Sequence, residues 1–423
     1  MLEISKIREN INLITERLKV KNFDATGYIK KLLETDTKRR ETQKQLDDSL
    51  AESNTISKQI GELFKSGQGE KANELKQRTT ELKQTTKELS AQLDELESEQ
   101  NSILVLLPNV PHEKVPPGKT VDDNEIVHSE GEAFDMGKEA LPHWDIAAKY
   151  DIIDFELGTK ITGAGFPLYK GKGAKLQRAL ITFFLDEAIN AGYTEYQPPL
   201  MVNEDSAFAT GQLPDKDGQM YHVVSDNFYL IPTSEVPVTN IFRNEILNEK
   251  ELPLKCTAYS QCFRREAGSY GKDVRGLNRL HQFDKVEIVQ ITHPDKSYEA
   301  LEEMNEYVQG ILRKLELPYR VARLCGGDIS FASAMTYDME VWSAAQKRWL
   351  EVSSVSNFEA FQSNRMKLRF KNSDGKTQLA HTLNGSALAL PRIMAALLEN
   401  NQTDKGIKIP KALVKYTGFE FVE

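Results

Sequence analysis

The sequence has few cysteines and histidines, and none of them is spaced like a metal or disulfide framework. Its 423 residues include three cysteines, Cys256, Cys262 and Cys325, without a CxxC pair, and seven histidines without zinc-ligand spacing. A secreted disulfide scaffold is therefore excluded and no zinc site is expected. A reducing compartment suits this cysteine pattern, so we predict a cytoplasmic protein.

Long apolar runs and two common phosphate-binding loops are also missing. No stretch of 18 apolar residues occurs, so no membrane-spanning helix is expected. The N-terminal segment MLEISKIREN is charged and lacks the apolar centre of a signal peptide. GxxxxGK[ST] and a strand-linked GxGxxG are both absent. If the protein binds phosphate, arginine side chains are the expected donors.

The composition is that of a globular chain with an acidic balance. Hydrophobic residues make up 39% and charged residues 28% of the sequence, and the formal net charge is −9. This charge excludes a uniformly basic nucleic-acid-binding protein, although a local basic surface is compatible with it. No DNA partner is expected. The length suggests two domains.

The N-terminal quarter of the chain has the pattern of two long helices. Residues 1–107 contain no proline, and the glycine-containing segment KSGQGEK (65–71) divides them. A short amphipathic helix is expected first, and the first long helix then has apolar residues near one seam at Leu32, Leu46, Leu50, Ile60 and Phe64. The second repeats every seven residues at Leu75, Leu82, Leu89, Leu96 and Ile103, with Leu93 between. This heptad repeat predicts a long antiparallel coiled-coil hairpin as a domain over 1–107.

The rest of the chain is predicted to be one α+β domain. The proline-rich segment 108–120 is expected to be a linker, and residues 121–423 the domain. The periodicities predict helices over 171–193 and 295–317, strands over 194–202, 227–238 and 281–291, a strand pair over 337–358, and a glycine-led helix over 384–401. Long excursions and hairpin-like strand pairs indicate a largely antiparallel sheet.

One segment, residues 262–288, concentrates charges beside residues typical of a strand core. A solvated hairpin and a nucleotide-binding hairpin both fit this pattern. Because residues two apart share a face of a strand, Arg264 and Glu266 are expected on one face, as are Arg279, His281 and Phe283. An arginine fork can hold a phosphate, a glutamate can accept from the adenine amino group, and a phenylalanine can stack on a purine.

Several motifs resemble those of class II aminoacyl-tRNA synthetases. The segment 262–288 resembles the second signature motif, HTLNGSALALPR (381–392) the third, and the helix before YQPP the first, which in that class lies at a dimer interface. TSEVP, FRREAGSYGKD, HQFDKVE, EVSSVSNFEAFQSNR and TLNGSALA, with the N-terminal hairpin, resemble the bacterial type of the seryl-tRNA synthetase family across nearly the whole chain. One departure is LALPR, where many members have a glycine before the arginine.

The resemblance implies a class II antiparallel sheet with flanking helices, and a homodimer. It implies ATP-dependent activation of L-serine to seryl-adenylate, followed by transfer to the 3′ end of serine tRNA. AMP and pyrophosphate would be released, Mg²⁺ would assist, and selenocysteine tRNA is a further expected substrate. The hairpin would bind the tRNA, and basic candidates on its first arm are Lys30, Lys38, Arg39, Arg40, Lys44 and Lys58.

The resemblance also implies a role for individual residues. Arg264 and Arg392 would be catalytic, with Arg264 bridging the serine carboxylate and the α-phosphate. The ATP contacts would be Arg264, Arg265, Glu266, Arg279, Phe283, Glu351, Val352, Ser353, Ser354 and Arg392. The serine contacts would be Thr233, Ser234, Glu235, Arg264, Glu287, Asn384 and Ser386. Mg²⁺ would be held by Glu351 and Ser354, since phosphate-bound magnesium prefers oxygen ligands.

Other interpretations exist for the same features. The Thr-Ser-Glu segment is also a helix-capping signal, Phe283 alone would more often be a core residue, and Arg265 would point away from Arg264 by strand alternation. Two rival functions are activation of an amino acid for a protein carrier, and a coiled-coil assembly protein with an inactive body. The full-length hairpin argues against the first, and the retained Arg264, Glu266 and Arg392 argue against the second.

Overall fold

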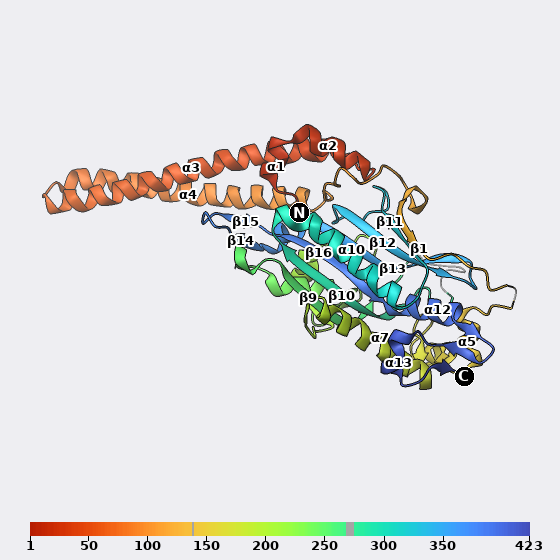
Figure 1. Cartoon of the computed structure of the whole chain (residues 1–423). Helices are drawn as coiled ribbons and strands as arrows, with labels where there is room; N and C mark the ends of the chain where they lie inside the picture. Colours follow the sequence, from red (N-terminus) through yellow and green to blue (C-terminus); the bar gives the residue numbers. More distant parts are fainter. Residues whose placement is uncertain (138, 268–274) are drawn as a thin grey trace. The chain divides into compact units, whose positions relative to one another are not determined.

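The computed structural model describes residues 1–137, 139–267 and 275–423, and these form two compact units. One unit comprises Leu2–Lys19 and Phe23–Pro108; the other comprises Met1, Val20–Asn22 and Asn109–Glu423. We call them the hairpin unit and the body (Figure 1). Most of the loop that the sequence predicts between its nucleotide-binding strands, residues 268–274, lies outside the described residues.

The hairpin unit consists of helices that pair along a heptad seam. Helices α1 (Ile4–Glu9) and α2 (Ile11–Val20) stand where a single short helix is predicted. Helices α3 (Thr26–Lys65) and α4 (Gly69–Leu104) then lie side by side as the two arms (Figure 1). None of the predicted heptad residues of α4 is exposed, and the two long helices are consistent with the helical hairpin predicted from this repeat.

The predicted seam on the first arm is wrong at two positions. Leu50 is 46% exposed and Phe64 48% exposed, because the seam passes through Ser49 and Leu63, one residue before each of them. Steps of three and four residues from Leu46 lead to these positions, and the pairing with α4 fixes that register even where it places a serine in the seam.

A buried carboxylate connects three helices of the hairpin unit. The side chain of Asp36 on α3 is 2% exposed, and its oxygens lie 3.5 Å from Arg8 Nη1 and 3.6 Å from Arg39 Nε. Gln100 Nε2 of α4 donates to Asp36 Oδ1 at 3.2 Å. Arg39, a predicted tRNA contact, is therefore engaged inside the unit.

The body is built on a sheet of eight strands within the described residues. Their order is β1 (Glu125–Glu130), β11 (Tyr319–Arg323), β12 (Met335–Ser343), β13 (Arg348–Glu359), β16 (His381–Ala389), β10 (Gln282–Thr292), β9 (Leu254–Phe263) and β4 (Thr194–Glu195). Neighbours pair antiparallel, except that β4 runs parallel to β9 at the edge. The predicted α+β class with an antiparallel sheet is confirmed.

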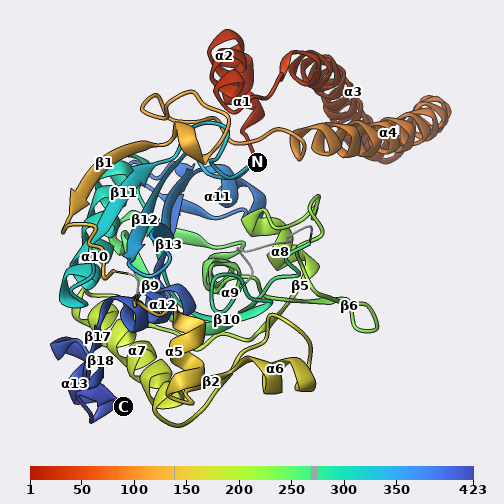
Figure 2. The same ribbon diagram turned by 90° about the vertical axis from the view of Figure 1, so that its right-hand side faces the viewer.

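Helices cover both faces of this sheet. On one face α7 (Gly171–Asn190), α10 (Ser297–Lys314) and α12 (Leu390–Asn400) enclose the main apolar core (Figures 1 and 2). On the other face α8 (Glu204–Thr210), α9 (Glu235–Thr239) and α11 (Phe361–Met366) pack around a second core (Figure 2). Val286 and Ile288 of β10 belong to the main core. Strand alternation therefore turns Lys285 and Glu287 toward the side of α9.

Two predicted elements are wrong in type. Residues 227–238, predicted as a strand, form β7 (Phe228–Leu230) and then α9. Residues 384–401, predicted as a glycine-led helix, begin with the end of β16, and the helix starts at Leu390. Gly385 permits close strand packing, since a Cβ there would lie 2.8 Å from Val355 Cγ2 on β13. The glycine signals a close approach between strands instead of a turn.

The proline-rich segment after α4 belongs to the body from Asn109 onward and is hydrogen-bonded within it. Asn109 Nδ2 donates to the carbonyls of Ala332 and Phe358 at 2.9 and 2.8 Å, and His112 N donates to Ala334 O at 2.8 Å.

None of the described helices combines the length and the apolar character needed to cross a bilayer.

Candidate functional site

The β9–β10 hairpin brings a predicted phosphate ligand against a predicted purine-stacking ring. Phe283 on β10 pairs with Cys262 on β9, and Arg264 follows β9 directly. Arg264 N donates to His281 O at 2.9 Å, which extends the pairing beyond the strand end. The Arg264 guanidinium carbon lies 5.1 Å from the centroid of the Phe283 ring, and Arg264 Nε donates to Pro232 O at 3.4 Å. The structure thus brings these two residues together, as expected.

Glu266 and Arg279 are brought together in a way that alternation does not predict. Strand β9 ends at Phe263, and Glu266 adopts a left-handed conformation with φ 49°. Its carboxylate Oε2 accepts from Arg279 Nε at 2.5 Å. The expectation that Arg264 and Glu266 share a strand face fails because no strand continues to Glu266. Arg265 is exposed, and its backbone N donates to Gln219 O at 2.8 Å.

The interior of β10 carries a buried ion pair. The side chains of Lys285 and Glu287 are 6% and 2% exposed and form a short salt bridge. Thr233 Oγ1 accepts from Lys285 Nζ at 2.7 Å and donates to Glu287 Oε2 at 3.1 Å. Glu287 and Thr233 are predicted serine contacts, whereas Lys285 was not predicted. Because residues two apart on a strand share a face, the sequence places Lys285 on the same face as Phe283 and Glu287.

Glu235 is a second buried carboxylate beside this ion pair. It begins α9, and its backbone N donates to Thr233 Oγ1 at 3.2 Å; the N-cap residue of this helix is Ser234, whose side chain makes no capping hydrogen bond. Burial raises the pKa of the Glu235 carboxyl to about 7, and the nearby charge of Glu287 adds to the increase. Gln362 Nε2 donates to Glu235 Oε1 at 2.7 Å and acts in the opposite direction. We call Thr233, Glu235, Lys285 and Glu287 the acidic pocket.

The neighbouring strand β16 adds an amide without a partner. Ser386 lies opposite Glu287 across the β10–β16 ladder, and Asn384 lies opposite Val289. Asn384 is 7% exposed, and within the described part of the chain its Nδ2 has no hydrogen-bond partner. It is nevertheless near enough to the Glu235 carboxylate to lower its pKa slightly. A buried donor without a full set of partners in the protein is available to a bound ligand.

One predicted serine contact is engaged elsewhere. Ser234 is fully buried, and its Oγ lies 2.5 Å from Ser260 Oγ on β9. Its side chain is therefore part of the packing between α9 and the sheet.

A β-bulge on β13 places Glu351 and Ser354 on one face. Asp338 pairs with Ser354 and Glu340 with Glu351, and the register shifts between these pairs. Without the bulge, residues three apart would face opposite sides. Ser354 Oγ donates to Asp338 Oδ1. Burial of Asp338, with the charge of Glu351 beside it, raises the pKa of Asp338 well above its usual range.

These groups fit a cation only in combination with other ligands. Glu351, Ser354 and Asp338 supply oxygen donors, and the raised pKa of Asp338 reflects a negative charge that a cation would relieve. Over the described ranges, no three His, Cys, Asp or Glu side chains are placed to hold a metal together. Magnesium at this face would thus need phosphate oxygens or water as well.

Val352 and Ser353, between these donors, do not present side chains to the same face. Val352 is 1% exposed and packs in the main core, so the prediction of a nucleotide contact can hold only for its backbone. Ser353 is also buried, and its Oγ donates to Ser386 O at 2.5 Å.

Arg392 lies in the first turn of α12. Its Nη1 donates to Glu351 O at 2.7 Å and lies 3.6 Å from Glu351 Oε2. Its Nε donates to Asn278 O at 3.2 Å. The Arg392 guanidinium thus contacts both the backbone of the loop between β9 and β10 and the oxygen-rich face of β13.

The site therefore combines three kinds of group on adjoining strands. Arg264 and Phe283 can hold a phosphate and an aromatic base. The acidic pocket can hold an ammonium group, and Arg392 with Glu351 and Ser354 can hold polyphosphate with a cation. Asp338, Lys285 and Gln362 are the residues that the sequence prediction missed.

Comparisons with known proteins agree with this combination. Residues 1–111 match the seryl-tRNA synthetase N-terminal domain, and residues 221–401 match the class II tRNA synthetase core domain (G, H, P, S and T). A serine–tRNA ligase of Salinibacter ruber is 51% identical over 423 residues, covering 99% of this chain and 98% of that protein. The seryl-tRNA synthetase of Pyrococcus horikoshii, solved with ATP, superposes with a TM-score of 0.92 at 34% identity, covering 99% of each chain. A cytoplasmic serine–tRNA ligase of Naegleria fowleri, solved with AMP, has a TM-score of 0.88 at 27% identity, covering 100% of this chain and 99% of that one.

Proposed function

The chain belongs to the seryl-tRNA synthetase family, and we propose from its geometry which residues carry out the reaction. It is a class II ligase that activates serine with ATP and transfers the seryl group to serine tRNA. The observation that carries the assignment is the Arg264 guanidinium over the Phe283 ring, next to the acidic pocket. This arrangement suits one ligand that is aromatic at one end, anionic in the middle and cationic at the other end.

Phe283 and Arg264 take the adenine ring and the α-phosphate. A purine stacks on the Phe283 ring, and the Arg264 fork reaches both the α-phosphate and the serine carboxylate. Glu266 accepts from the adenine amino group. The ion pair with Arg279 holds Glu266 in place despite its left-handed backbone.

The acidic pocket and Asn384 take the serine. With Glu235 ionised, the pocket contains two carboxylates and one ammonium, a net charge of −1 that the serine ammonium neutralises. The free Asn384 amide and Thr233 donate to or accept from the serine hydroxyl and carboxylate. Alanine would leave buried polar groups unpaired and is rejected on that ground, while threonine is excluded by shape.

The first step needs no general base, because the serine carboxylate is already an anion at neutral pH. A carboxylate oxygen forms a bond to the α-phosphorus in line with the departing oxygen, and that P–O bond breaks to release pyrophosphate. Arg264 and Arg392 orient the two anions and stabilise the charge on the phosphoryl oxygens. In the second step the terminal 3′ hydroxyl of the tRNA attacks the seryl carbonyl, and AMP leaves.

Glu351 and Ser354, with Asp338 beside them, are the proposed Mg²⁺ ligands. When bound, the ion neutralises charge on the leaving phosphates. The support is the oxygen-rich face that the bulge of β13 creates, together with the raised pKa of Asp338.

The hairpin unit is the proposed tRNA-binding domain, over residues 1–107. A linker over 108–120 leads to a catalytic domain over 121–423, and the boundary between the two compact units after Pro108 supports the end of the tRNA-binding domain. Lys30, Lys38, Arg40, Lys44 and Lys58 are exposed on α3 and suit phosphate contacts, while Arg39 is paired with Asp36. A helical arm that recognises the shape of a double-stranded stem would also accept selenocysteine tRNA.

A cytoplasmic homodimer is the proposed assembly. Apolar side chains are exposed around the predicted first motif: Ile189 is 46%, Tyr196 36%, Leu200 36% and Met201 50% exposed. They lie at the end of α7 and beyond the edge strand β4. An apolar surface of this kind is typical of a subunit interface. Three free buried cysteines suit a reducing cytoplasm.

ATP–pyrophosphate exchange in the presence of serine tests the residue assignment. Arg264→Ala is expected to lower the exchange rate about 100-fold or more, the usual effect of removing one preorganised donor. Arg313→Ala serves as the control, since it removes a surface arginine of α10 that pairs with Glu306 and Glu130. It should change the rate less than about two-fold. Equal rates in the two variants would contradict the role of Arg264.

A further inference from the structure

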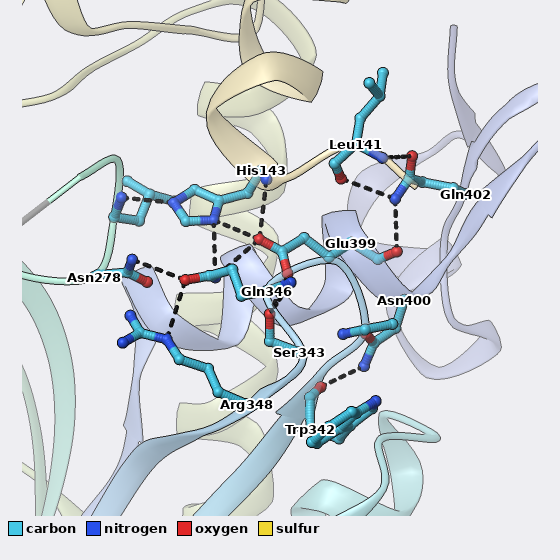
Figure 3. A network of polar contacts seen from close by, with 12 residues as sticks. Leu141, His143, Asn278, Trp342, Ser343, Gln346, Arg348, Glu399, Asn400 and Gln402 are labelled. Atoms are coloured by element: carbon cyan, nitrogen blue, oxygen red, sulfur yellow. Dashed lines mark hydrogen bonds and ion pairs between the residues drawn. The ribbon is translucent and has the colours of Figure 1, made fainter. Parts of the chain in front are cut away.

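A buried histidine–glutamate pair lies next to the loop that Arg392 contacts. The reaction proposed above gives this pair no role. His143 is the first residue of α5 (His143–Lys149), and Glu399 lies in the last turn of α12. Both side chains are completely buried, and His143 Nδ1 is 2.7 Å from Glu399 Oε1 (Figure 3). Burying two such groups is costly unless each is fully paired, so their partners show what the pair holds.

Glu399 collects several donors. Its Oε1 also accepts from the backbone N of His143 at 3.0 Å and from Gln346 Nε2 at 2.9 Å, and its Oε2 accepts from Ser343 Oγ (Figure 3). Burial alone would raise the pKa of Glu399, but these hydrogen bonds and the adjacent His143 keep it below its usual value. Glu399 is therefore a carboxylate at neutral pH.

The other ring nitrogen of His143 faces the loop that returns to β10. The backbone N of Leu277 donates to His143 Nε2 at 2.8 Å. A backbone N–H can only donate, so Nε2 carries the lone pair and Nδ1 carries the proton that goes to Glu399. The tautomer is thus fixed by its two partners. If the ring were doubly protonated, the Nε2–H of His143 would face the Leu277 N–H, and two donors would oppose each other.

The same short segment is held at further points. We call Arg275–Asn278 the loop base; it follows residues 268–274 and leads to Arg279. The Arg275 guanidinium lies 4.7 Å from the Trp144 ring centroid on α5, and Asn278 Nδ2 donates to Gln346 Oε1 at 3.0 Å. Gly276 has φ 66°, and a Cβ there would lie 2.2 Å from His143 Nε2. No side chain at position 276 would fit against the imidazole.

One helix holds this segment at two places. Arg392 and Glu399 are seven residues apart on α12, two helical turns, and so project from nearly the same side. Arg392 Nε donates to Asn278 O at 3.2 Å, and Glu399 reaches Leu277 N through His143. Two adjacent residues of the loop base, Leu277 and Asn278, therefore connect through their backbones to the two ends of α12.

We propose that His143 and Glu399 are positioning residues for ATP binding, which fix the loop base and, through the Asn278 carbonyl, the guanidinium of Arg392. The inference rests on the proposed phosphate-binding role of Arg392. Without the acceptor at His143 Nε2, the loop base moves and Arg392 loses the oxygen that orients its Nε. ATP binding then weakens, while the serine-binding acidic pocket on β10 and α9 is unchanged.

Two substitutions of His143 separate positioning from simple burial. His143→Asn places an amide donor near the Nδ1 position and retains the contact with Glu399, but cannot reach Leu277 N. His143→Gln places a carbonyl oxygen near the Nε2 position and can accept from Leu277 N, but leaves Glu399 with one donor fewer. If His143 positions the loop base, His143→Asn should weaken ATP binding more than His143→Gln does. A purely structural role predicts that Gln is worse for stability and that ATP binding is unchanged in both.

The measurement is the KM for ATP and the KM for serine in ATP–pyrophosphate exchange, on the full chain, with thermal unfolding to verify folding. His143→Asn should raise the ATP KM about ten-fold, the scale of one lost hydrogen bond to a buried group, and His143→Gln less than about three-fold. The serine KM should stay within about two-fold in both. Tyr298→Phe, which removes the partly buried hydrogen bond of 2.6 Å from Tyr298 to Glu359 Oε1, is the control for general destabilisation and should leave both KM values unchanged.

Two results would overturn the inference: an unchanged ATP KM in folded His143→Asn protein, or equal ATP KM values in the two variants. Arg392→Ala tests the underlying assignment separately. If it leaves exchange unchanged, the role of Arg392 fails, whatever the His143 variants show.

Discussion

Lys285 and Glu287, two residues apart on β10, form a buried ion pair, and both contact the Thr233 hydroxyl. Among the four residues of the acidic pocket, these two form the only pair of opposite charges. Both ions have lost their hydration, so each depends on the other and on Thr233.

Removing either partner alone should destabilise the body strongly. Lys285→Met and Glu287→Gln are each expected to lower the free energy of unfolding by about 3 kcal/mol, because an unpaired charge or polar group stays buried. The double variant should lose less than the sum, since no uncompensated charge remains. All three tryptophans, Trp144, Trp342 and Trp349, lie in the body, so urea unfolding followed by tryptophan fluorescence reports on this unit alone. Additive losses would show that the two side chains do not depend on each other.

Serine binding should depend on the ionisation of Glu235. Its pKa is raised to about 7, so the carboxyl becomes neutral below that pH and no longer balances the serine ammonium. The serine KM in the exchange reaction is expected to increase as the pH falls from 7 to 6, by up to about ten-fold per unit. Glu235→Gln should have a high serine KM that varies little over this range. A wild-type serine KM that is constant from pH 6 to 8 would contradict the assignment.

The same pKa predicts an opposite trend for the stability of the unliganded protein. A carboxyl whose pKa is raised from 4.5 to about 7 binds a proton more tightly when folded, so its contribution is present at low pH and is lost as the pH rises through 7. Between pH 4.5 and 7 this loss amounts to about 3 kcal/mol. The difference in unfolding free energy between wild type and Glu235→Gln should therefore shift in favour of the variant as the pH rises.

Asn384→Ala should separate stability from function. The Asn384 Nδ2 has no hydrogen-bond partner within the described residues, so removing this donor breaks no hydrogen bond that Nδ2 makes. We expect the free energy of unfolding to change by less than about 1 kcal/mol and the serine KM to rise about ten-fold. Asn357→Ala is the contrast, because its Nδ2 donates to Ser297 Oγ at 3.1 Å inside the core. It should destabilise the body without changing the serine KM.

Charge reversal on the first hairpin arm should affect tRNA charging alone. The double variant Arg40→Glu, Lys44→Glu is expected to reduce kcat/KM for tRNA at least ten-fold and to lower the salt dependence of tRNA binding by about one unit of slope per lost phosphate contact. ATP–pyrophosphate exchange should be unchanged. The matched control, Lys83→Glu with Lys87→Glu on the second arm, makes the same charge change at exposed positions. Equal loss in both variants would contradict the assignment to the first arm.

Much of the architecture follows from local periodicity. The heptad from Leu75 to Ile103 predicts the second arm correctly, because each repeat residue must face the other helix to be buried. On the first arm Leu50 lies outside the seam and Ser49 within it, since the register is set by the partner helix and apolar character alone does not determine it.

Contacts within the candidate site were predictable from the sequence where both residues belong to one hairpin. Phe283 lies on β10 and Arg264 directly follows the paired strand β9, so their proximity follows from the hairpin. Asp338 and Gln362 come from other elements, and only the folded sheet shows that they contact Ser354 and Glu235. Glu266 could not be placed by alternation, because β9 ends at Phe263 and the backbone of Glu266 is left-handed.

The bulge of β13 also determines which sequence changes this enzyme tolerates. Over the stretch that ends at Ser354, β13 contains one residue more than the β12 segment it pairs with. Replacing Val352 by another apolar residue changes only its packing in the core. Deleting one residue there would restore a regular ladder and turn either Glu351 or Ser354 to the opposite face of the sheet. Chain length at this point therefore constrains the variation of the protein more tightly than side-chain identity does.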